Sequence, residues 1–239
     1  MPTTRNELVR SHDGDTFDAF CAVPEAPPAP GILLFQEVFG INDNMRGLAL
    51  RLAEQGYVVL APDVFWREQR RFERKDESGL AEGAALARRL DFELVAKDIT
   101  STFAHLLAMP ECDGAVGGVG FCLGGTLAYL FATESRVDGR GPNAVVSYYG
   151  SAIKDVQAGS RKVDCPMLFH YGSDDPYIPQ ERVDEVEAAF ADHSDVTVLR
   201  YDAGHAFSNW DAPSFYDKAA ADLAWSRTLE FFAKHLTTP

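Results

Sequence analysis

Four positions in this sequence carry side chains that could perform chemistry together, and each follows an apolar run. They are Glu37, Cys122, Asp174 or Asp175, and His205. A cysteine can attack a carbonyl carbon, a histidine can act as base and acid, and an aspartate can hold that histidine in its working tautomer. These residue types indicate acyl transfer, with Cys122 as the nucleophile.

The surroundings of Cys122 predict a tight corner between a strand and a helix. An apolar run from Val116 ends in Gly120-Phe121-Cys122-Leu123-Gly124-Gly125, and a helix-like pattern over 126–132 follows at once. The nucleophile of α/β-hydrolases sits on a strained turn of this kind, where small neighbours permit the crowded backbone. Taken alone, the stretch leaves a second interpretation open, which is a buried and unreactive cysteine in a glycine-rich turn.

The rest of the chain alternates strand-like and helix-like patterns. Apolar runs predict strands at 31–35, 57–60, 144–150 and 166–172, and we expect a further strand at 196–201. Apolar residues at helical spacing predict helices within 45–53, 79–90, 95–106, 183–190 and 225–236. Such alternation is typical of a mostly parallel central sheet with helices on both faces. We therefore expect an α/β-hydrolase fold, built as a single domain over residues 1–239.

This architecture explains how the reactive residues would meet. The carboxyl ends of parallel strands open onto a common crevice, and each reactive residue follows a predicted strand. Cysteine, aspartate and then histidine is also the order in which α/β-hydrolases carry their triad. Two backbone N–H groups could stabilise the oxyanion, that of Leu123 just after the nucleophile and that of Val38 after the early strand.

Two connecting segments have distinctive compositions. Thr16 to Val23 has the pattern of a half-buried strand, and the proline-rich stretch 24–30 then interrupts regular structure. We expect an edge hairpin with a proline-stiffened connection here. Residues 65–78 are dense in charge, which predicts a solvated excursion beside the site, with a lid or substrate-access segment as the alternative.

Composition limits the partners of the protein. The chain has 22 basic and 36 acidic residues and a formal charge of −14, which argues against nucleic acid binding. No apolar run approaches the ~20 residues that span a bilayer, and no signal-like pattern opens the chain, so we expect a cytoplasmic protein without membrane contact. We also expect a monomer or a weak homo-oligomer.

The cysteines do not suggest a metal or disulfide framework. They stand at positions 21, 112, 122 and 165, at long spacings and mostly within apolar runs. A Cys-His-Asp metal site is conceivable, but no His-x-x-x-His or Cys-x-x-Cys pattern supports it. We expect no metal and no cofactor.

At its motifs the chain resembles the dienelactone hydrolase family, over nearly its whole length. The resemblance lies in residues 36–42, 61–63, 120–125, 148–150, 172–179 and 203–207. It implies a cofactor-free hydrolase of carboxylic esters or lactones, with a thioacyl intermediate on Cys122. It also implies that Asp175, four residues before Pro179, is the triad aspartate. Glu37 would face the thiol in the resting enzyme and help form the thiolate when substrate arrives.

The resemblance also bears on substrate binding, and there the sequence departs from the family. Phe39, Tyr149 and Asn209 are the candidate substrate-binding residues. The family holds a substrate carboxylate with two arginines, and this chain has Asn209 and Leu80 at those places. Arg74, Arg88 or Arg89 could replace one of them. A neutral lactone, an aryl ester, a thioester or a peptide-like substrate is therefore the alternative to a carboxylated dienelactone.

Two rival functions belong to other classes. A nucleotide-binding protein would need glycine at position 123 to complete a dinucleotide fingerprint, and Leu123 occupies that place. A thiol-redox or non-catalytic binding protein would use Cys122 without needing His205.

Overall fold

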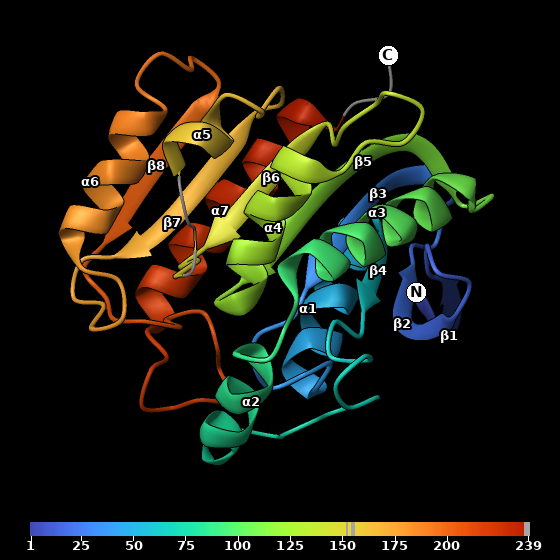
Figure 1. Ribbon diagram of the computed structural model, residues 1–239, viewed down its shortest axis with the longest axis horizontal. Helices are drawn as coiled ribbons and strands as arrows, with labels where there is room; N and C mark the ends of the chain where they lie inside the picture. The colour runs from blue at the N-terminus through green and yellow to red at the C-terminus, as the bar shows by residue number, and fades with distance from the viewer. Residues whose placement is uncertain (152, 154–155, 237–239) are drawn as a thin grey trace.

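One eight-stranded sheet forms the centre of the protein, with helices on both of its faces (Figure 1). The computed structural model describes residues 1–151, 153 and 156–236. The strands are β1 (Thr3–Arg10), β2 (Thr16–Val23), β3 (Ala29–Phe35), β4 (Val58–Pro62), β5 (Cys112–Phe121), β6 (Ala144–Tyr148), β7 (Met167–Gly172) and β8 (Val196–Tyr201). The helices are α1 (Asp43–Glu54), η1 (Glu77–Gly79), α2 (Leu80–Ala87), α3 (Phe92–Ala108), α4 (Leu123–Glu134), α5 (Val156–Ser160), α6 (Gln180–Ala189) and α7 (Lys218–His235).

The sheet is mostly parallel, as the sequence predicts. Its strand order is β1-β2-β4-β3-β5-β6-β7-β8, and only the pairs β1–β2 and β2–β4 are antiparallel. The register aligns Phe35 with Gly120, and Phe121 with Tyr148. The carboxyl ends of β3, β5 and β6 therefore meet at one edge, which is where ligands bind in such sheets.

Glycines in β5 let helices approach the middle of the sheet from both sides. A Cβ on Gly117 would lie 3.1 Å from the Phe232 ring of α7, and one on Gly118 would lie 2.7 Å from the Phe131 ring of α4. Successive strand residues point to opposite faces, so α7 and α4 cover opposite faces of the sheet. The predicted α/β-hydrolase fold is confirmed.

Helix α1 begins and ends where its sequence indicates. The side chain of Asn42 accepts a hydrogen bond from the N–H of Met45 at 3.1 Å, so Asn42 is the cap. Gly56 follows the helix at a φ of 94°, a conformation that glycine adopts without strain.

The edge hairpin is formed by β2 and the strand before it in the chain, and the proline segment follows β2 without being part of the hairpin. Strand β2 pairs in antiparallel register with β1, which precedes it in the chain. The segment after β2 instead leads to β3, and β4 lies between β2 and β3 in the sheet. Strand β4 pairs with β2 along Ala19–Ala22. Strands β2 and β3, which are consecutive in the chain, are therefore separated in the sheet by β4, which follows both of them in sequence.

Part of the charged segment 65–78 is packed against the rest of the protein. Phe65, Trp66 and Phe72 are buried. Arg67 donates to both carboxylate oxygens of the buried Asp98, at 2.7 and 2.8 Å. The solvated excursion predicted here is wrong for these four residues, because Arg67 pairs with a buried carboxylate and the three aromatic rings enter the core, whereas 69–71, 73, 75 and 78 are exposed as predicted. Within the described part of the chain, no helix is long and apolar enough to span a membrane.

Candidate active site

Cys122 occupies the corner between β5 and α4 in a strained conformation. Its φ of 55° and ψ of −115° lie in a region that residues with a Cβ rarely adopt. The backbone N–H of Cys122 donates to the carbonyl of Tyr148 at 3.1 Å, which ties the corner to β6. A Cβ on Gly120 would stand 1.9 Å from the carbonyl oxygen of Gly124, so the corner requires glycine there. This is the strand-turn-helix geometry that the sequence predicts.

The side chain of His205 links Cys122 to Asp175. Its Nε2 lies 3.2 Å from the Sγ of Cys122, and its Nδ1 lies 2.7 Å from an Oδ of Asp175. The other carboxylate oxygen of Asp175 accepts the N–H groups of Tyr177 and Ile178, at 2.8 and 3.1 Å. Asp174 is exposed and makes no contact of this kind within the described residues, so Asp175 is the aspartate that meets the histidine.

Electrostatics favour the charged form of His205. Burial by itself disfavours the imidazolium, but the hydrogen bonds to Asp175 and Cys122 outweigh it and raise the pKa of His205 to about 10. The ring therefore holds a proton on each nitrogen at neutral pH.

Glu37 lies next to this group, buried after the end of β3. Asn209 donates its side-chain N–H to one carboxylate oxygen, and the hydroxyl of Tyr149 donates to the other at 3.4 Å. Burial raises the pKa of Glu37 to about 7, against the opposing effects of the His205 charge and of these two donors. In the described residues no hydrogen bond joins Glu37 to Cys122, and the sulfur contacts His205 instead. The resting arrangement implied by the family resemblance, with Glu37 facing the thiol, stays a prediction.

A cavity of about 530 Å³ opens beside Cys122 and His205. Its volume suits a small-molecule ligand. Most of its wall is apolar. It is lined by Glu37, Val38, Phe39, Glu77, Ser78, Leu80, Ala81, Ala84, Cys122, Ser151, Tyr177, His205, Ala206 and Phe215. Among these residues there is no lysine and no arginine.

The arginines that could have replaced the missing anion-binding residues lie elsewhere. Arg74 contacts the carboxylate of Glu82, and Arg89 pairs with Glu68 at 2.6 Å. Neither these two residues nor Arg88 lines the cavity. Leu80, by contrast, contributes to its wall.

The other predicted site residues divide into two groups. Val38 and Phe39 line the cavity, and Leu123 is the first residue of α4, directly after Cys122. Within the described residues, the N–H groups of Val38 and Leu123 make no backbone hydrogen bond outside helices and strands, so both are available to a ligand. Tyr149 and Asn209 do not line the cavity but contact Glu37, and their contact with substrate stays a prediction.

Several cavity residues have no signal in the sequence that identifies them. Glu77, Ser78 and Phe215 belong to η1 and to the loop before α7, where no periodicity predicts what their side chains face. Tyr177 could have been found from its position two residues after Asp175. Its ring lies 5.1 Å from that of His205.

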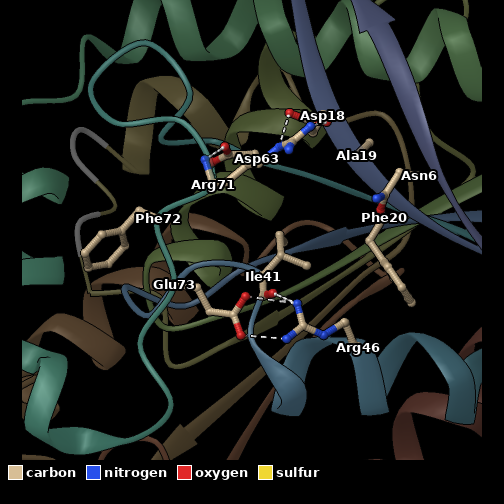
Figure 2. A pocket seen from close by; sticks show the side chains of 10 residues that line it. All are labelled: Asn6, Asp18, Ala19, Phe20, Ile41, Arg46, Asp63, Arg71, Phe72 and Glu73. Atoms are coloured by element: carbon tan, nitrogen blue, oxygen red, sulfur yellow. Dashed lines mark hydrogen bonds and ion pairs between the residues drawn. The ribbon is translucent and has the colours of Figure 1, made fainter.

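A second, more charged cavity lies away from Cys122, between the β1–β2 hairpin, α1 and residues 71–73 (Figure 2). Its volume is about 360 Å³. Arg46 pairs there with Glu73 at 2.6 Å, and Arg71 with Asp18 at 2.7 Å. Asp63, from the 61–63 motif, accepts the N–H of Arg71 at 2.6 Å. These charges pair with one another, and the pairs connect residues 71–73 to β2 and α1.

Fold and site together define an α/β-hydrolase, with a strained cysteine corner at the carboxyl edge of a mostly parallel sheet. The model of the dienelactone hydrolase family matches residues 17–236. The chain belongs to this family and is a hydrolase acting on ester or lactone bonds.

Individual relatives agree with this membership. A carboxymethylenebutenolidase from Pseudomonas putida is 33% identical over 233 residues, which cover 96% of this chain and 96% of that enzyme. The carboxymethylenebutenolidase of Rhodococcus opacus is 33% identical over 219 residues, covering 86% of this chain and 81% of that one. Among solved structures, a dienelactone hydrolase-like promiscuous phosphotriesterase from metagenomic libraries superimposes with a TM-score of 0.83. It has 25% identity, and the match covers 99% of each chain.

Proposed function

We propose that the protein hydrolyses carboxylic esters or lactones through a thioacyl intermediate on Cys122. His205 is the acid and base of this mechanism, and Asp175 orients it. The observation that carries the proposal is the continuous contact from Sγ to Nε2 at 3.2 Å and from Nδ1 to the carboxylate at 2.7 Å. Such a chain supplies a nucleophile, a proton carrier and a group that fixes the tautomer.

In the first half of the reaction, the thiolate of Cys122 attacks the substrate carbonyl carbon and a C–S bond forms. The carbonyl oxygen becomes an oxyanion, and the N–H groups of Val38 and Leu123 are positioned to donate to it. The C–O ester bond then breaks, and the departing alkoxide takes the proton from Nε2 of His205. An ester releases its alcohol at this step, whereas a lactone keeps the new hydroxyl on the acyl group.

In the second half, water attacks the thioester carbonyl carbon. His205 accepts the proton of the water through Nε2, and the same two N–H groups stabilise the second oxyanion. The C–S bond breaks, the acid leaves, and the imidazolium–thiolate pair forms again. Glu37 assists electrostatically, because an anion near His205 favours the imidazolium. Asn209 and Tyr149 hold Glu37 in place by their hydrogen bonds.

Replacement and trapping of Cys122 test this proposal. Cys122→Ala should lose turnover of 4-nitrophenyl esters, and brief mixing of the wild-type enzyme with a slow aryl ester should add one acyl mass to the peptide that contains Cys122. Cys112→Ala is the control, because that cysteine does not line the cavity. Undiminished turnover in Cys122→Ala would contradict the proposal.

His205→Ala separates hydrolysis from the thiol-redox and binding alternatives. A hydrolase of this kind should be crippled by the loss of its proton carrier, with a fall in kcat of about 100-fold or more. A redox or binding protein would retain its function.

A further inference from the structure

The cavity beside Cys122 contains acidic side chains and no basic ones among the residues that line it. Glu37 and Glu77 both line it, and Glu37 lies close to His205. His205 is the lining residue that can carry a positive charge, and its hydrogen bonds to Asp175 and Cys122 already use both ring nitrogens. A carboxylate on a substrate would therefore meet acidic groups and find no unengaged cation there.

Glu77 is hydrogen-bonded to the loop before α7. The Ser214 hydroxyl donates a hydrogen bond to its carboxylate, and these residues stand 137 positions apart in the chain. Ser214 precedes Phe215, which lines the cavity, so the bond joins η1 to the loop before α7. Among the described residues no lysine or arginine forms an ion pair with Glu77. Its charge is thus fixed in position without a paired cation.

Aromatic rings accompany this carboxylate. Phe39, Tyr177 and Phe215 all line the same cavity. The face of an aromatic ring attracts cations, and rings combined with a carboxylate are the chemistry that recognises ammonium groups. The rest of the wall is aliphatic, with Val38, Leu80 and Ala84 as examples, and this suits uncharged acyl chains.

Further acidic groups lie close to the loop that carries Ser214. Burial raises the pKa of Asp211, and the nearby charges of Asp43 and Asp76 act in the same direction, while Lys75 opposes them. Asp76 directly precedes η1, where it accepts the N–H of Ser78 at 3.0 Å. The field of several acidic groups repels anions as they approach.

From this arrangement, and resting on the proposed hydrolase function, we propose that the cavity selects its ester by charge. It takes esters whose acyl group is uncharged or carries an ammonium group, it disfavours those with a carboxylate, and Glu77 is the residue that sets this preference. The interaction acts at the cavity wall and not on the reacting atoms, so Glu77 determines specificity and does not take part in catalysis.

Matched esters test the preference directly. The substrates are 4-nitrophenyl hexanoate, mono-4-nitrophenyl adipate and 4-nitrophenyl 6-(trimethylammonio)hexanoate, with uncatalysed hydrolysis subtracted. We expect kcat/KM for the adipate to be lower than for the hexanoate by about 5-fold or more, and the ammonium ester to match or exceed the hexanoate. Glu77→Gln should reduce the difference between the adipate and the hexanoate several-fold. Equal kcat/KM for the adipate and the hexanoate would overturn the proposal.

Two variants show whether the charge itself is responsible. Ser214→Ala removes the hydrogen bond but keeps the carboxylate, so most of the preference should remain. Glu230→Gln removes a carboxylate that also accepts a serine hydroxyl, from Ser226 at 3.2 Å, but does not line the cavity. It should leave the preference unchanged. A change in Glu230→Gln as large as that in Glu77→Gln would show that net charge, not this cavity, decides.

Modification of Cys122 tests the charge preference independently of hydrolysis. The reagents are 2-(trimethylammonium)ethyl methanethiosulfonate and 2-sulfonatoethyl methanethiosulfonate. With each, the thiolate attacks the sulfenyl sulfur, a disulfide forms and methanesulfinate leaves. For Cys122 we take the rate constant with the cationic reagent divided by that with the anionic reagent. The same ratio measured with free 2-mercaptoethanol normalises it for the intrinsic reactivity of the reagents. The normalised ratio should be about 5 in the wild type and lower in Glu77→Gln. A normalised ratio of 1 overturns the proposal.

The two experiments separate this inference from the function on which it rests. Hydrolysis that requires Cys122 but shows no charge preference would overturn the inference and leave the hydrolase in place. A clear reagent preference without any hydrolysis that depends on Cys122 would support the charge-selective cavity and overturn the proposed function.

Discussion

Asn209 donates a hydrogen bond to the carboxylate of Glu37, 172 positions earlier in the chain. The family pattern has an arginine at position 209, where it would help hold a substrate carboxylate. In this protein the neutral amide points to an enclosed carboxylate of the protein itself. The bond keeps Glu37 turned toward Asn209 and Tyr149, while the sulfur of Cys122 contacts His205.

Replacement of Asn209 should destabilise the protein more at high pH than at low pH. The donor stabilises the ionised form of Glu37, so Asn209→Ala should raise the pKa of Glu37 above its present value of about 7. We expect a loss of about 1 to 3 kcal/mol in the free energy of unfolding at pH 8, and a smaller loss at pH 5. Urea denaturation at the two pH values measures this.

Asn44→Ala is the matched control for this variant. Asn44 is also buried, and its side-chain nitrogen has no hydrogen-bond partner among the described residues. Its replacement should change stability by a similar amount at both pH values. If Asn209→Ala were equally destabilising at pH 5 and pH 8, its side chain would not be supporting the charge on Glu37.

The ionisation of Glu37 should lower the free energy of unfolding as the pH rises. Its pKa is raised from the ordinary 4.5 to about 7, so the native state holds a proton that the unfolded state has lost between these values. The contribution of this group to the free energy of unfolding therefore decreases from pH 4.5 to pH 7, by about 2 to 3 kcal/mol. Glu37→Gln should remove that decrease. The measured quantity is the wild-type value minus the variant value, from urea denaturation at several pH values.

His205 should control the reactivity of Cys122 toward a neutral alkylating reagent. The Nε2 of His205 stands 3.2 Å from the sulfur, so the ring is in position to take the thiol proton as the thiol reacts. Alkylation by iodoacetamide at pH 6.5 should slow by about 10-fold or more in His205→Ala. Asp175→Asn should slow it less, because the ring remains. An unchanged rate in His205→Ala would show that the contact does not activate the thiol.

Much of the scaffold could be predicted from the sequence, because its signals are local. A continuous apolar run such as 31–35 specifies a strand buried on both faces, and the glycines around Cys122 specify the corner. The antiparallel pairing of β2 with β4 could not be predicted, since strand order depends on contacts between distant segments. The burial of Trp66 and Phe72 inside a highly charged stretch was hidden for a similar reason, because their partners come from other elements.

The site divides in the same way. The residue types at 122 and 205 indicated their chemistry, but they left Asp174 and Asp175 as alternatives. The family resemblance pointed to Asp175, and the fold shows it buried against two N–H donors while Asp174 is exposed. The contact of Asn209 with Glu37 has no signal in the sequence, because an amide in a loop can face substrate, solvent or another side chain. Only the folded chain brings Glu77 to the cavity wall.

His170 should lower the free energy of unfolding as the pH falls, which is the opposite of the pH dependence expected from Glu37. It is enclosed on β7, where its ring nitrogens contact the hydroxyls of Tyr201 at 2.7 Å and Thr228 at 3.1 Å. Burial, and to a lesser extent the charge of Arg227, lower the pKa of His170 to about 3. Between pH 6.5 and pH 3 the unfolded state therefore binds a proton that the native state does not. The free energy of unfolding should decrease as the pH falls through this range, by up to about 4 kcal/mol from this group.

The variant that checks this is His170→Gln, which removes the titrating ring and keeps a polar side chain near both hydroxyls. It should flatten the decrease in stability below pH 6.5, even where it is less stable than the wild type at pH 7. Glu37→Gln should steepen the same decrease, because it removes the group that stabilises the native state as the pH falls. Opposite changes of slope in these two variants, measured by urea denaturation from pH 4.5 to pH 6.5, are the expected result. An identical slope in His170→Gln and the wild type would mean that His170 is protonated in the native state, and that its two hydroxyl partners do not keep it neutral.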